Sequence, residues 1–416
     1  MAVWEGTDDK LYAKRYVSGA WSQLTDLVSN DLTPVGVASV NPQIAILGDG
    51  DALLIWEEKN VKSVTVKLWS RRYSKQTQRW SNTSEVVNRD ATIYASTVIA
   101  MPKLISNTAG DAAVVWWQNL AADSVTVGVF VETSDYSKWY RRVLAAGQWD
   151  STPSLSSLYT YYVPYDLSTA LSNTGTLVIG DRGSDWSTFS SAQICVAPKV
   201  GASWTDFSYP PSGLVNDVQY DGGGWVNLYD PRNLALGFRK DGMLVVTWLQ
   251  DSFDSSQYAS VARQTASTYD LGNPNGLGLQ KQEFIDGNSN PFSSSDFIPT
   301  IVPVANGFVA AKIGNAYFRF NIDNVWGQRF EIGTITDYAA IGVDGRGNVI
   351  MVTQPPKDTT VTGGRRILAM GISQTNLQVG SATGEITQPA VAVAASGDAL
   401  AIWKDKSGLL FSSLFH

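Results

Sequence analysis

One fifteen-residue segment occurs three times in this chain. It reads PQIAILGDGDALLIW at Pro42–Trp56, PKLISNTAGDAAVVW at Pro102–Trp116 and PAVAVAASGDALAIW at Pro389–Trp403. Every copy has a proline, seven residues, a glycine, five residues and a tryptophan. A repeat of this kind indicates one supersecondary unit made several times, and it constrains the fold more than any other feature of the sequence.

Looser copies start at Pro164, Pro231, Pro299 and Tyr338, so successive repeats begin 39 to 68 residues apart. That spacing is too long for the coil of a solenoid and suits a four-stranded propeller blade. No stretch of ten or more residues has a helical period. The sequence therefore predicts an all-β protein, a closed β-propeller of four-stranded blades that spans residues 1–416 as a single domain.

The segments of each unit predict its strands. The first segment is short and apolar, and we expect its proline to begin a strand, where no ladder donor is lost. A Gly-Asp, Asp-Gly or Asn-Gly step then supplies the positive φ of a tight hairpin, at 49–51, Asp241-Gly242 and Asn306-Gly307. The second segment is unbroken apolar, which indicates burial on both faces. The third alternates, and the fourth often opens with an aromatic residue.

The repeated tryptophans are expected to fill the space between neighbouring blades. They are Trp4, Trp56, Trp116, Trp248 and Trp403. The amino-terminal segments read as second, third and fourth strands, and the carboxyl-terminal ones as first, second and third. Because both ends supply a second strand with a tryptophan, we favour eight blades over seven. Either number brings the two ends of the chain together.

Composition excludes several classes of function. The net charge is −7 and no run of Lys or Arg occurs, which argues against a nucleic acid or a membrane surface as partner. No segment has the roughly 20 apolar residues of a spanning helix, and the first residues lack the pattern of a secretory signal. We expect either a cytosolic protein or one whose signal is not part of this sequence.

The small numbers of cysteine and histidine residues exclude further kinds of chemistry. Cys195 is the only cysteine, so an intramolecular disulfide is impossible, and its apolar neighbours predict a buried strand. His416 is the only histidine and the last residue. Catalytic triads and zinc sites built on histidine are therefore not expected.

The connections that follow second strands, and those between blades, are the richest in polar and aromatic residues. The former carry Glu5, Glu57, Glu58, Gln118 and Lys404 among others, and the latter include 151–163 and 209–230. Aromatic planes beside carboxylates suit a sugar ring, although such aromatics also fix long loops to a propeller rim. The ligand-binding candidates are Tyr161, Tyr162, Tyr209, Tyr220, Asp221, Trp225, Tyr229, Asp251 and Asp254.

Two weaker patterns concern ions. Asp49, Asp51 and Asp344 supply clustered carboxylate oxygens of the kind that bind calcium. They fall in hairpin turns, however, and such turns prefer the same residues. Arg71-Arg72, Arg141-Arg142 and Arg365-Arg366 could bind anionic sugars. Adjacent strand residues point to opposite faces, so we expect at most one arginine of each pair to join a site.

The repeats of this chain resemble those of secreted bacterial β-propeller proteins, including lectin-like propellers and biofilm-matrix adhesins. The segments that carry the resemblance are PQIAILGDGDALLIW with WSRRYSKQTQRW, and MAVW with LYAKRYVSGAW. The resemblance covers nearly the whole chain and implies carbohydrate binding outside the cell or at its surface. It assigns no ligand residue. Sialidases have a repeat resembling Ser-x-Asp-x-Gly-x-Thr-Trp, and the nearest string here, SNTAGDAA at 106–113, lacks its Asp and aromatic residue.

Three functions follow from this reading. The first is a non-catalytic adhesin or lectin-like propeller that binds a polysaccharide or glycoconjugate, with calcium as the one conceivable cofactor and no catalytic residue assigned. The second is a sialidase-like hydrolase, which needs two carboxylates roughly 5 to 9.5 Å apart. The third is a protein-docking propeller in a surface assembly or a virion.

Overall fold

The structure is a computed structural model, in which part of the chain is described. The described residues are 1–6, 10–17, 20–23, 25–26, 38–59, 65–81, 85–87, 99–107, 109–119, 137–145, 148–149, 154–160, 167–183, 191–197, 228–239, 241–254, 259–271, 278–284, 300–304, 307–311, 315–322, 325–326, 330–334, 339–343, 349–353, 360–363, 377–381, 386–393, 398–405 and 410–415. They form strands and turns without a helix, which confirms the all-β prediction, and they accordingly offer no helix that could cross a membrane.

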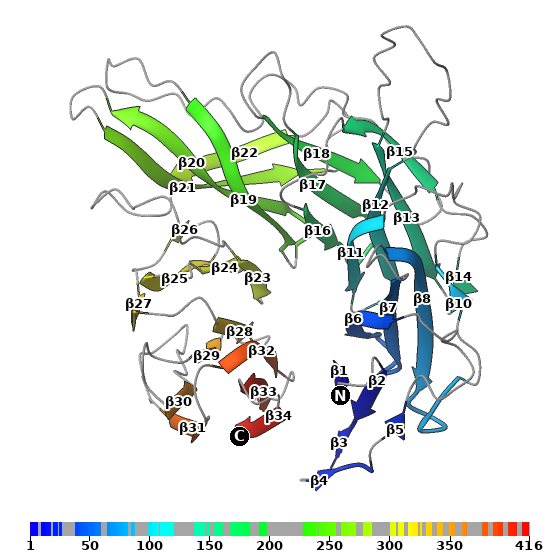
Figure 1. Ribbon diagram of the computed structural model, residues 1–416. Coiled ribbons are helices and arrows are strands. Elements are labelled where there is room, and N and C mark those ends of the chain that lie inside the picture. Colours follow the sequence, from blue (N-terminus) through cyan, green and yellow to red (C-terminus); the bar gives the residue numbers. More distant parts are fainter. Residues whose placement is uncertain are drawn as a thin grey trace, which may run out of the picture. The chain divides into compact units, whose positions relative to one another are not determined.

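The chain divides into two compact units, residues 1–188 with 193–210 and residues 189–192 with 211–416. The first unit has four sheets and a two-stranded ribbon, labelled in Figure 1. They are sheet 1 (β1 Ala2–Glu5, β2 Leu11–Lys14, β5 Thr25–Asp26), the ribbon (β3 Tyr16–Val17, β4 Ala20–Trp21), sheet 2 (β6 Ala38–Ile46, β7 Ala52–Lys59, β8 Thr65–Ser74, β9 Arg79–Trp80, β10 Glu85–Val86), sheet 3 (β11 Ile99–Ser106, β12 Ala112–Asn119, β13 Ser137–Ala145, β14 Gln148–Trp149, β15 Ser154–Thr160) and sheet 4 (β16 Leu167–Leu171, β17 Leu177–Gly183, β18 Ser191–Ala197).

The second unit continues the series with four more sheets. They are sheet 5 (β19 Leu228–Phe238, β20 Leu244–Asp254, β21 Ala259–Asp270, β22 Gly278–Phe284), sheet 6 (β23 Thr300–Val304, β24 Gly307–Ala311, β25 Asn315–Ile322, β26 Val325–Trp326, β27 Phe330–Thr334), sheet 7 (β28 Ala339–Val343, β29 Val349–Thr353, β30 Thr360–Gly363, β31 Leu377–Ser381) and sheet 8 (β32 Ile386–Val393, β33 Ala399–Asp405, β34 Leu410–Phe415).

Each sequence repeat corresponds to one sheet. The seven repeats begin in or just before β6, β11, β16, β19, β23, β28 and β32, each the first strand of a sheet that pairs in chain order. Sheet 8 has the first, second and third strands predicted for the carboxyl-terminal end. Sheet 1 has the predicted second and third strands, but the segment GAWSQL predicted as its fourth strand contributes β4 to the ribbon, and the short β5 that follows pairs with β2 instead. The number of blades, the closed ring and the single domain stay predictions.

Four of the repeat prolines, Pro42, Pro102, Pro231 and Pro389, lie inside the first strands, which corrects the prediction that they begin them. β6 starts four residues before Pro42, and its register with β7 shifts between Val40 and Gln43. Similar shifts occur beside Pro102 in β11, Pro231 in β19 and Pro389 in β32. A β-bulge leaves residues out of the ladder, so a residue without an N–H is accommodated there.

The first hairpins of four sheets share one turn. In sheet 2 the N–H of Leu47 donates to Asp51 O and the N–H of Gly50 donates to Leu47 O, both over 2.8 Å. Equivalent pairs close the turns at 107–111, 172–176 and 239–243. Their glycines have φ between 85° and 98°: Gly50, Gly110, Gly175 and Gly242. The positive φ predicted for these hairpins is thus confirmed at Gly50 and Gly242, and Asn306 lies outside the described residues.

The second strands are the core of the molecule. In β7 seven of the eight residues are buried, as its unbroken apolar segment predicts. Trp56, Trp116, Trp248 and Trp403 are buried, whereas Trp4 in the edge strand β1 is only half-buried. Several of these rings face an aromatic residue on the next strand: Trp4 stacks on Tyr12, Trp56 on Trp69 and Trp403 on Phe411. Burial of one indole removes about 150–250 Å² from water, worth roughly 4–6 kcal/mol.

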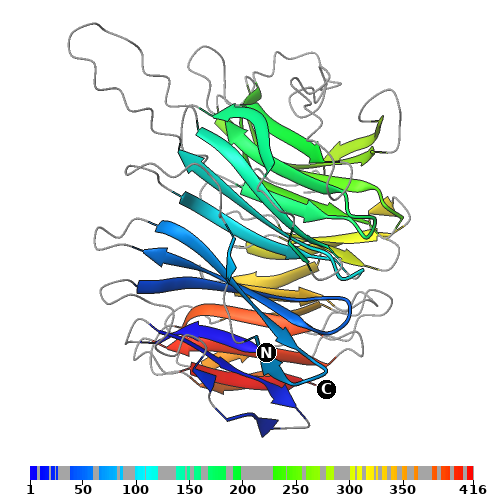
Figure 2. The same ribbon diagram turned by 90° about the vertical axis from the view of Figure 1, so that its right-hand side faces the viewer.

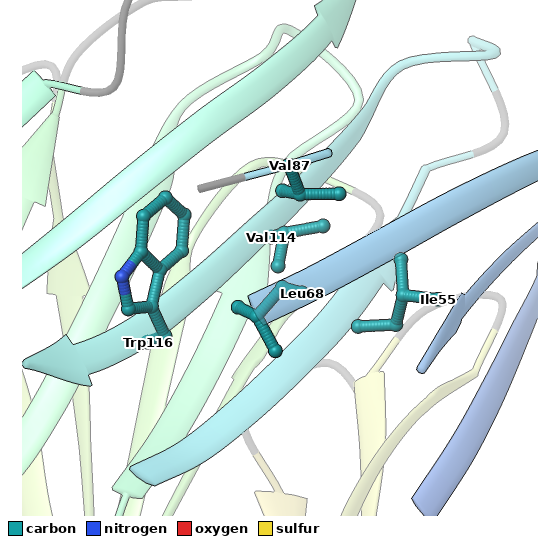
Figure 3. Close-up of a cluster of buried hydrophobic side chains, with 5 residues drawn as sticks. All are labelled: Ile55, Leu68, Val87, Val114 and Trp116. Atoms are coloured by element: carbon teal, nitrogen blue, oxygen red, sulfur yellow. The ribbon is translucent and has the colours of Figure 1, made fainter. Parts of the chain in front are cut away.

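Within the first unit, consecutive sheets pack face to face. Sheet 1 contacts sheet 2 through β1 and β2 against β6, and their strands lie side by side in Figure 2. Leu11 and Ala13 of sheet 1 form one buried cluster with Leu54 and Trp56 of sheet 2. Figure 3 shows the next cluster, where Ile55, Leu68 and Val87 of sheet 2 meet Val114 and Trp116 of sheet 3.

Polar side chains also join consecutive sheets. Gln43 of β6 donates from Nε2 to Pro102 O over 2.7 Å and accepts the Leu104 N–H at Oε1 over 3.0 Å. Both backbone groups belong to β11, where Pro102 lies in the bulge and Leu104 follows it. Asn107 of sheet 3 donates to Ser172 O of sheet 4 over 2.8 Å. In the second unit, β19 contacts β23, β23 contacts β28, and β28 and β29 contact β32.

Candidate functional site

The structure describes few of the predicted ligand-binding residues. Tyr229 lies in β19, and Asp251 and Asp254 lie in β20, where the register pairs Tyr229 with Asp251 across the two strands. The other candidates, Tyr161, Tyr162, Tyr209, Tyr220, Asp221 and Trp225, lie outside the described residues. The long-loop site therefore stays a prediction.

The first predicted calcium turn is occupied by protein groups. Arg72 donates from Nη2 to Asp49 Oδ2 and from Nε to Asp51 Oδ2, each over 2.9 Å. Asp51 also accepts the Lys75 N–H over 2.8 Å. The described residues hold no group of three or more acidic, histidine or cysteine side chains that could bind a metal. Asp344 lies outside them.

Glu57 and Glu58 lie inside β7 and are buried, although the sequence placed them in a connection after that strand. Glu57 Oε1 accepts from Asn41 Nδ2 over 3.0 Å. Glu58 accepts from Trp69 Nε1 over 2.7 Å and pairs with Lys67 Nζ at 3.5 Å. These partners compensate the carboxylates for lost hydration, which lets the strand continue past its tryptophan.

A groove of about 390 Å³ lies between sheets 1 and 2. One side is formed by Met1, by Ala13 and Lys14 of β2, and by Arg15 and Ser22 at the ends of the ribbon. The other side is formed by the end of β8, the turn after it and β9, with the residues Arg71, Tyr73, Gln78, Arg79 and Trp80. The site thus combines two aromatic rings, several cations and the neutral polar groups of Ser22 and Gln78.

The two sides of the groove are copies of one local motif. RYVSGAWS at 15–22 and RYSKQTQRWS at 72–81 each form a short hairpin in which tyrosine pairs with tryptophan. In both copies the Ser N–H donates to the Arg carbonyl oxygen over 2.7 Å. Tyr16 meets Trp21 edge to face at 5.3 Å, and Tyr73 meets Trp80 in the same way at 5.4 Å.

Arg15 joins the two copies. Its Cζ lies 5.6 Å from the centroid of the Tyr73 ring, Nη1 donates to the Tyr73 hydroxyl, and Nη2 donates to Gln78 Oε1 over 2.9 Å. Gln78 has φ of 57°, a conformation that costs a non-glycine residue about 1 kcal/mol or more. The guanidinium is therefore held in a fixed position in the groove.

The groove is positive although the chain is acidic. Its lining includes Lys14, Arg15, Arg71 and Arg79, and none of its lining residues is Asp or Glu. Burial lowers the pKa of the Met1 α-amino group below its usual value, and the positive charge of Arg15 lowers it further. A site of this kind favours a negatively charged ligand.

The adjacent arginines Arg71 and Arg72 point to different partners. Arg71 lines the groove and its Nε donates to Ser81 O over 2.6 Å, whereas Arg72 turns to Asp49 and Asp51. Of this pair only Arg71 lines the groove, and its part in binding a ligand stays a prediction. The sequence predicted a site at the connections after second strands, whereas this groove lies beside the hairpins after third strands. The repeated Arg-Tyr and Trp-Ser steps were the signal that could have found it.

Neither a protein family nor a curated protein matches the chain by sequence. Among solved structures, an α-L-arabinanase from Penicillium chrysogenum in complex with arabinobiose is 14% identical; the match covers 91% of this chain and 93% of the arabinanase at a TM-score of 0.40. The NanB sialidase from Streptococcus pneumoniae is 8% identical, with 90% and 67% covered and a TM-score of 0.41. A protein of unknown function from Dyadobacter fermentans is 10% identical, with 91% and 94% covered and a TM-score of 0.39.

This comparison contradicts the expectation that the chain is not an enzyme, because two of these solved structures are enzymes, an arabinanase and a sialidase. That expectation rested on the repeated residues, which build the scaffold, and a scaffold does not decide whether a site is catalytic. No match identifies the secreted bacterial propeller proteins, so that resemblance stays a prediction.

Proposed function

We propose that this chain is a carbohydrate-binding β-propeller that holds a polysaccharide or glycoconjugate in the groove between sheets 1 and 2. In this proposal the eight sheets are the blades of one closed ring, and the protein acts outside the cell or at its surface. The repeated order of strands supports the ring. The resemblance of the repeats to secreted propeller proteins supports the location.

The composition of the groove carries the proposal. Sugar rings bind proteins through C–H faces that stack on aromatic side chains and through hydroxyls that bond to polar groups. Here Trp80 is half-buried in the wall of the groove, and Tyr73 holds it edge to face. Ser22 and Gln78 lie on opposite sides, within one cavity of about 390 Å³, which is the size of many small-ligand sites.

A panel of immobilised oligosaccharides tests the proposal. We expect the intact protein to bind a subset of the panel, and Gln78→Ala to weaken that binding because it removes a polar group of the groove and the partner of Arg15. The same incubations are analysed for released sugars, which measures glycoside hydrolysis directly. The proposed site would be contradicted if the intact protein bound none of the oligosaccharides, or if the Gln78→Ala protein bound them as well as the intact protein does.

An experimental structure of the whole chain tests the ring. We expect eight blades, with sheet 1 and sheet 8 as neighbours. An open arrangement of the sheets, or seven blades with the terminal strands in one sheet, would contradict this part of the proposal.

A further inference from the structure

Arg15 of the groove differs from Arg72 in its partners. Arg72 occupies the same place in its motif as Arg15 does, because each precedes the tyrosine that pairs with tryptophan. Two carboxylates neutralise Arg72, those of Asp49 and Asp51. Arg15 instead bonds to neutral groups of Tyr73 and Gln78 in the described part of the chain.

Two further cations of the groove have no protein anion among the described residues. Lys14 lies at the end of β2 and is half-buried, and Arg79 lies in β9 and is exposed. Three positive side chains, Lys14, Arg15 and Arg79, therefore line one cavity without a described carboxylate. Positive charges this close repel one another, and a bound anion relieves the repulsion.

The position of Arg15 adds geometry to charge. Its guanidinium is fixed by the Tyr73 hydroxyl and by Gln78, so little side-chain freedom remains to be lost when a ligand binds. A guanidinium presents parallel N–H groups that match the two oxygens of a carboxylate or the oxygens of a sulfate. Trp80 lies in the same cavity and offers a ring for the sugar that carries the acid.

We infer that the groove selects acidic glycans, in which a carboxylate or sulfate group on the sugar binds Lys14, Arg15 and Arg79 while the sugar ring stacks on Trp80. This inference rests on the proposed glycan-binding function and names its ligand class. The neutral members of a glycan panel lack the group that the three cations recognise.

Calorimetric titration of the full chain tests the inference with four probes. They are a galacturonic acid tetramer, a sulfated galactan tetramer, neutral galactotetraose and, as an anion without sugar, a glutamate tetramer. We expect the acidic sugars to bind at least tenfold more tightly than the neutral one, and the preference to shrink when salt is raised from 0.05 to 0.5 M. The carboxylated and sulfated probes show which acidic group the groove prefers.

The variants distinguish the groove from the general charge of the surface. Arg79→Gln and Lys14→Gln each remove one cation with no described partner, and each is expected to weaken the acidic sugars by roughly tenfold, with little change for the neutral one. Lys75→Gln is the matched control: Lys75 is exposed in the same hairpin as Arg79 but lies outside the groove lining. It is expected to leave binding unchanged.

Each result decides the inference. If neutral and acidic sugars bind equally, or if Lys75→Gln weakens binding as much as Arg79→Gln does, the groove does not select acidic glycans, although the proposed function survives. If the glutamate tetramer binds as tightly as the acidic sugars, the groove recognises charge without sugar and both ideas fail. Binding of none of the three sugars overturns the inference, and the oligosaccharide panel then decides whether the proposed function stands.

Discussion

Gln43 and Pro102 connect two sheets through one hydrogen bond of 2.7 Å, from the side-chain amide of the first to the carbonyl oxygen of the second. The same amide accepts the N–H of Leu104. Pro102 lies in the bulge of β11 and Leu104 lies just after it, and the neighbouring sheet supplies partners to both residues that the ladder does not.

Replacement of Gln43 tests this role. Gln43→Ala leaves two partly buried backbone groups without a protein partner and is expected to lower the free energy of unfolding by about 1–3 kcal/mol. Gln43→Glu keeps an acceptor for the Leu104 N–H but places a carboxylate oxygen against Pro102 O, and because the two oxygens repel each other it should cost at least as much as Gln43→Ala. Chemical denaturation of the three proteins measures both values. A loss below about 0.5 kcal/mol in Gln43→Ala, the scale of an ordinary surface substitution, would contradict the role.

The repeated tryptophans predict a graded loss of stability. Trp116 is fully buried between sheets 2 and 3, and Trp116→Ala is expected to cost about 3–5 kcal/mol. Trp4 occupies the same position in the repeat but is half-buried in an edge strand, so Trp4→Ala should cost clearly less. Urea denaturation of both variants measures the difference, and equal losses would show that the place in the repeat matters more than burial.

The hairpin glycines predict a second comparison. Gly242→Ala forces a positive φ on alanine, with no atom near the added Cβ, and is expected to cost about 1 kcal/mol. Gly50→Ala has the same backbone cost, and its Cβ would also lie 2.6 Å from Cδ of Lys75. Thermal unfolding of Gly50→Ala with and without Lys75→Ala separates the two effects. The larger loss should fall to that of Gly242→Ala once Lys75 is shortened.

The two carboxylates that bind Arg72 should contribute unequally to the free energy of unfolding. The Asp51 side chain is 14% exposed and accepts from both Arg72 and the Lys75 N–H, whereas the Asp49 side chain is 54% exposed. Asp51→Asn is therefore expected to cost about 1 kcal/mol, and Asp49→Asn only a few tenths. Denaturation in low and high salt measures both. A greater loss of stability in Asp49→Asn than in Asp51→Asn would mean that exposure does not determine how much each ion pair with Arg72 contributes.

Patterns local in the sequence predicted much of the fold. The unbroken apolar run before Trp56 predicted burial on both faces, and β7 is buried along nearly its whole length. The glycine at 50 predicted a positive φ because few other residues adopt it. Both features depend on residues that are neighbours in the chain, and both repeat from sheet to sheet.

Features that depend on distant partners were not predictable in this way. The bulge at Pro42 is defined by its register with β7, and the burial of Glu57 depends on Asn41, sixteen residues earlier. The groove depends on Arg15 reaching Tyr73 and Gln78, which are 58 and 63 residues away. The repeated Arg-Tyr and Trp-Ser steps mark each side of the groove, but nothing in the sequence shows that Arg15 of one copy contacts Tyr73 and Gln78 of the other.

The packing of consecutive sheets in each unit has a consequence for synthesis on the ribosome. Sheet 2 packs on sheet 1, sheet 3 on sheet 2 and sheet 4 on sheet 3 within the first unit, and the order of docking is the order of translation. A nascent chain can thus cover the apolar face of each sheet as soon as the following sheet has emerged. Only the outer face of sheet 1 and the free face of the newest sheet then need shielding from aggregation at any moment of elongation.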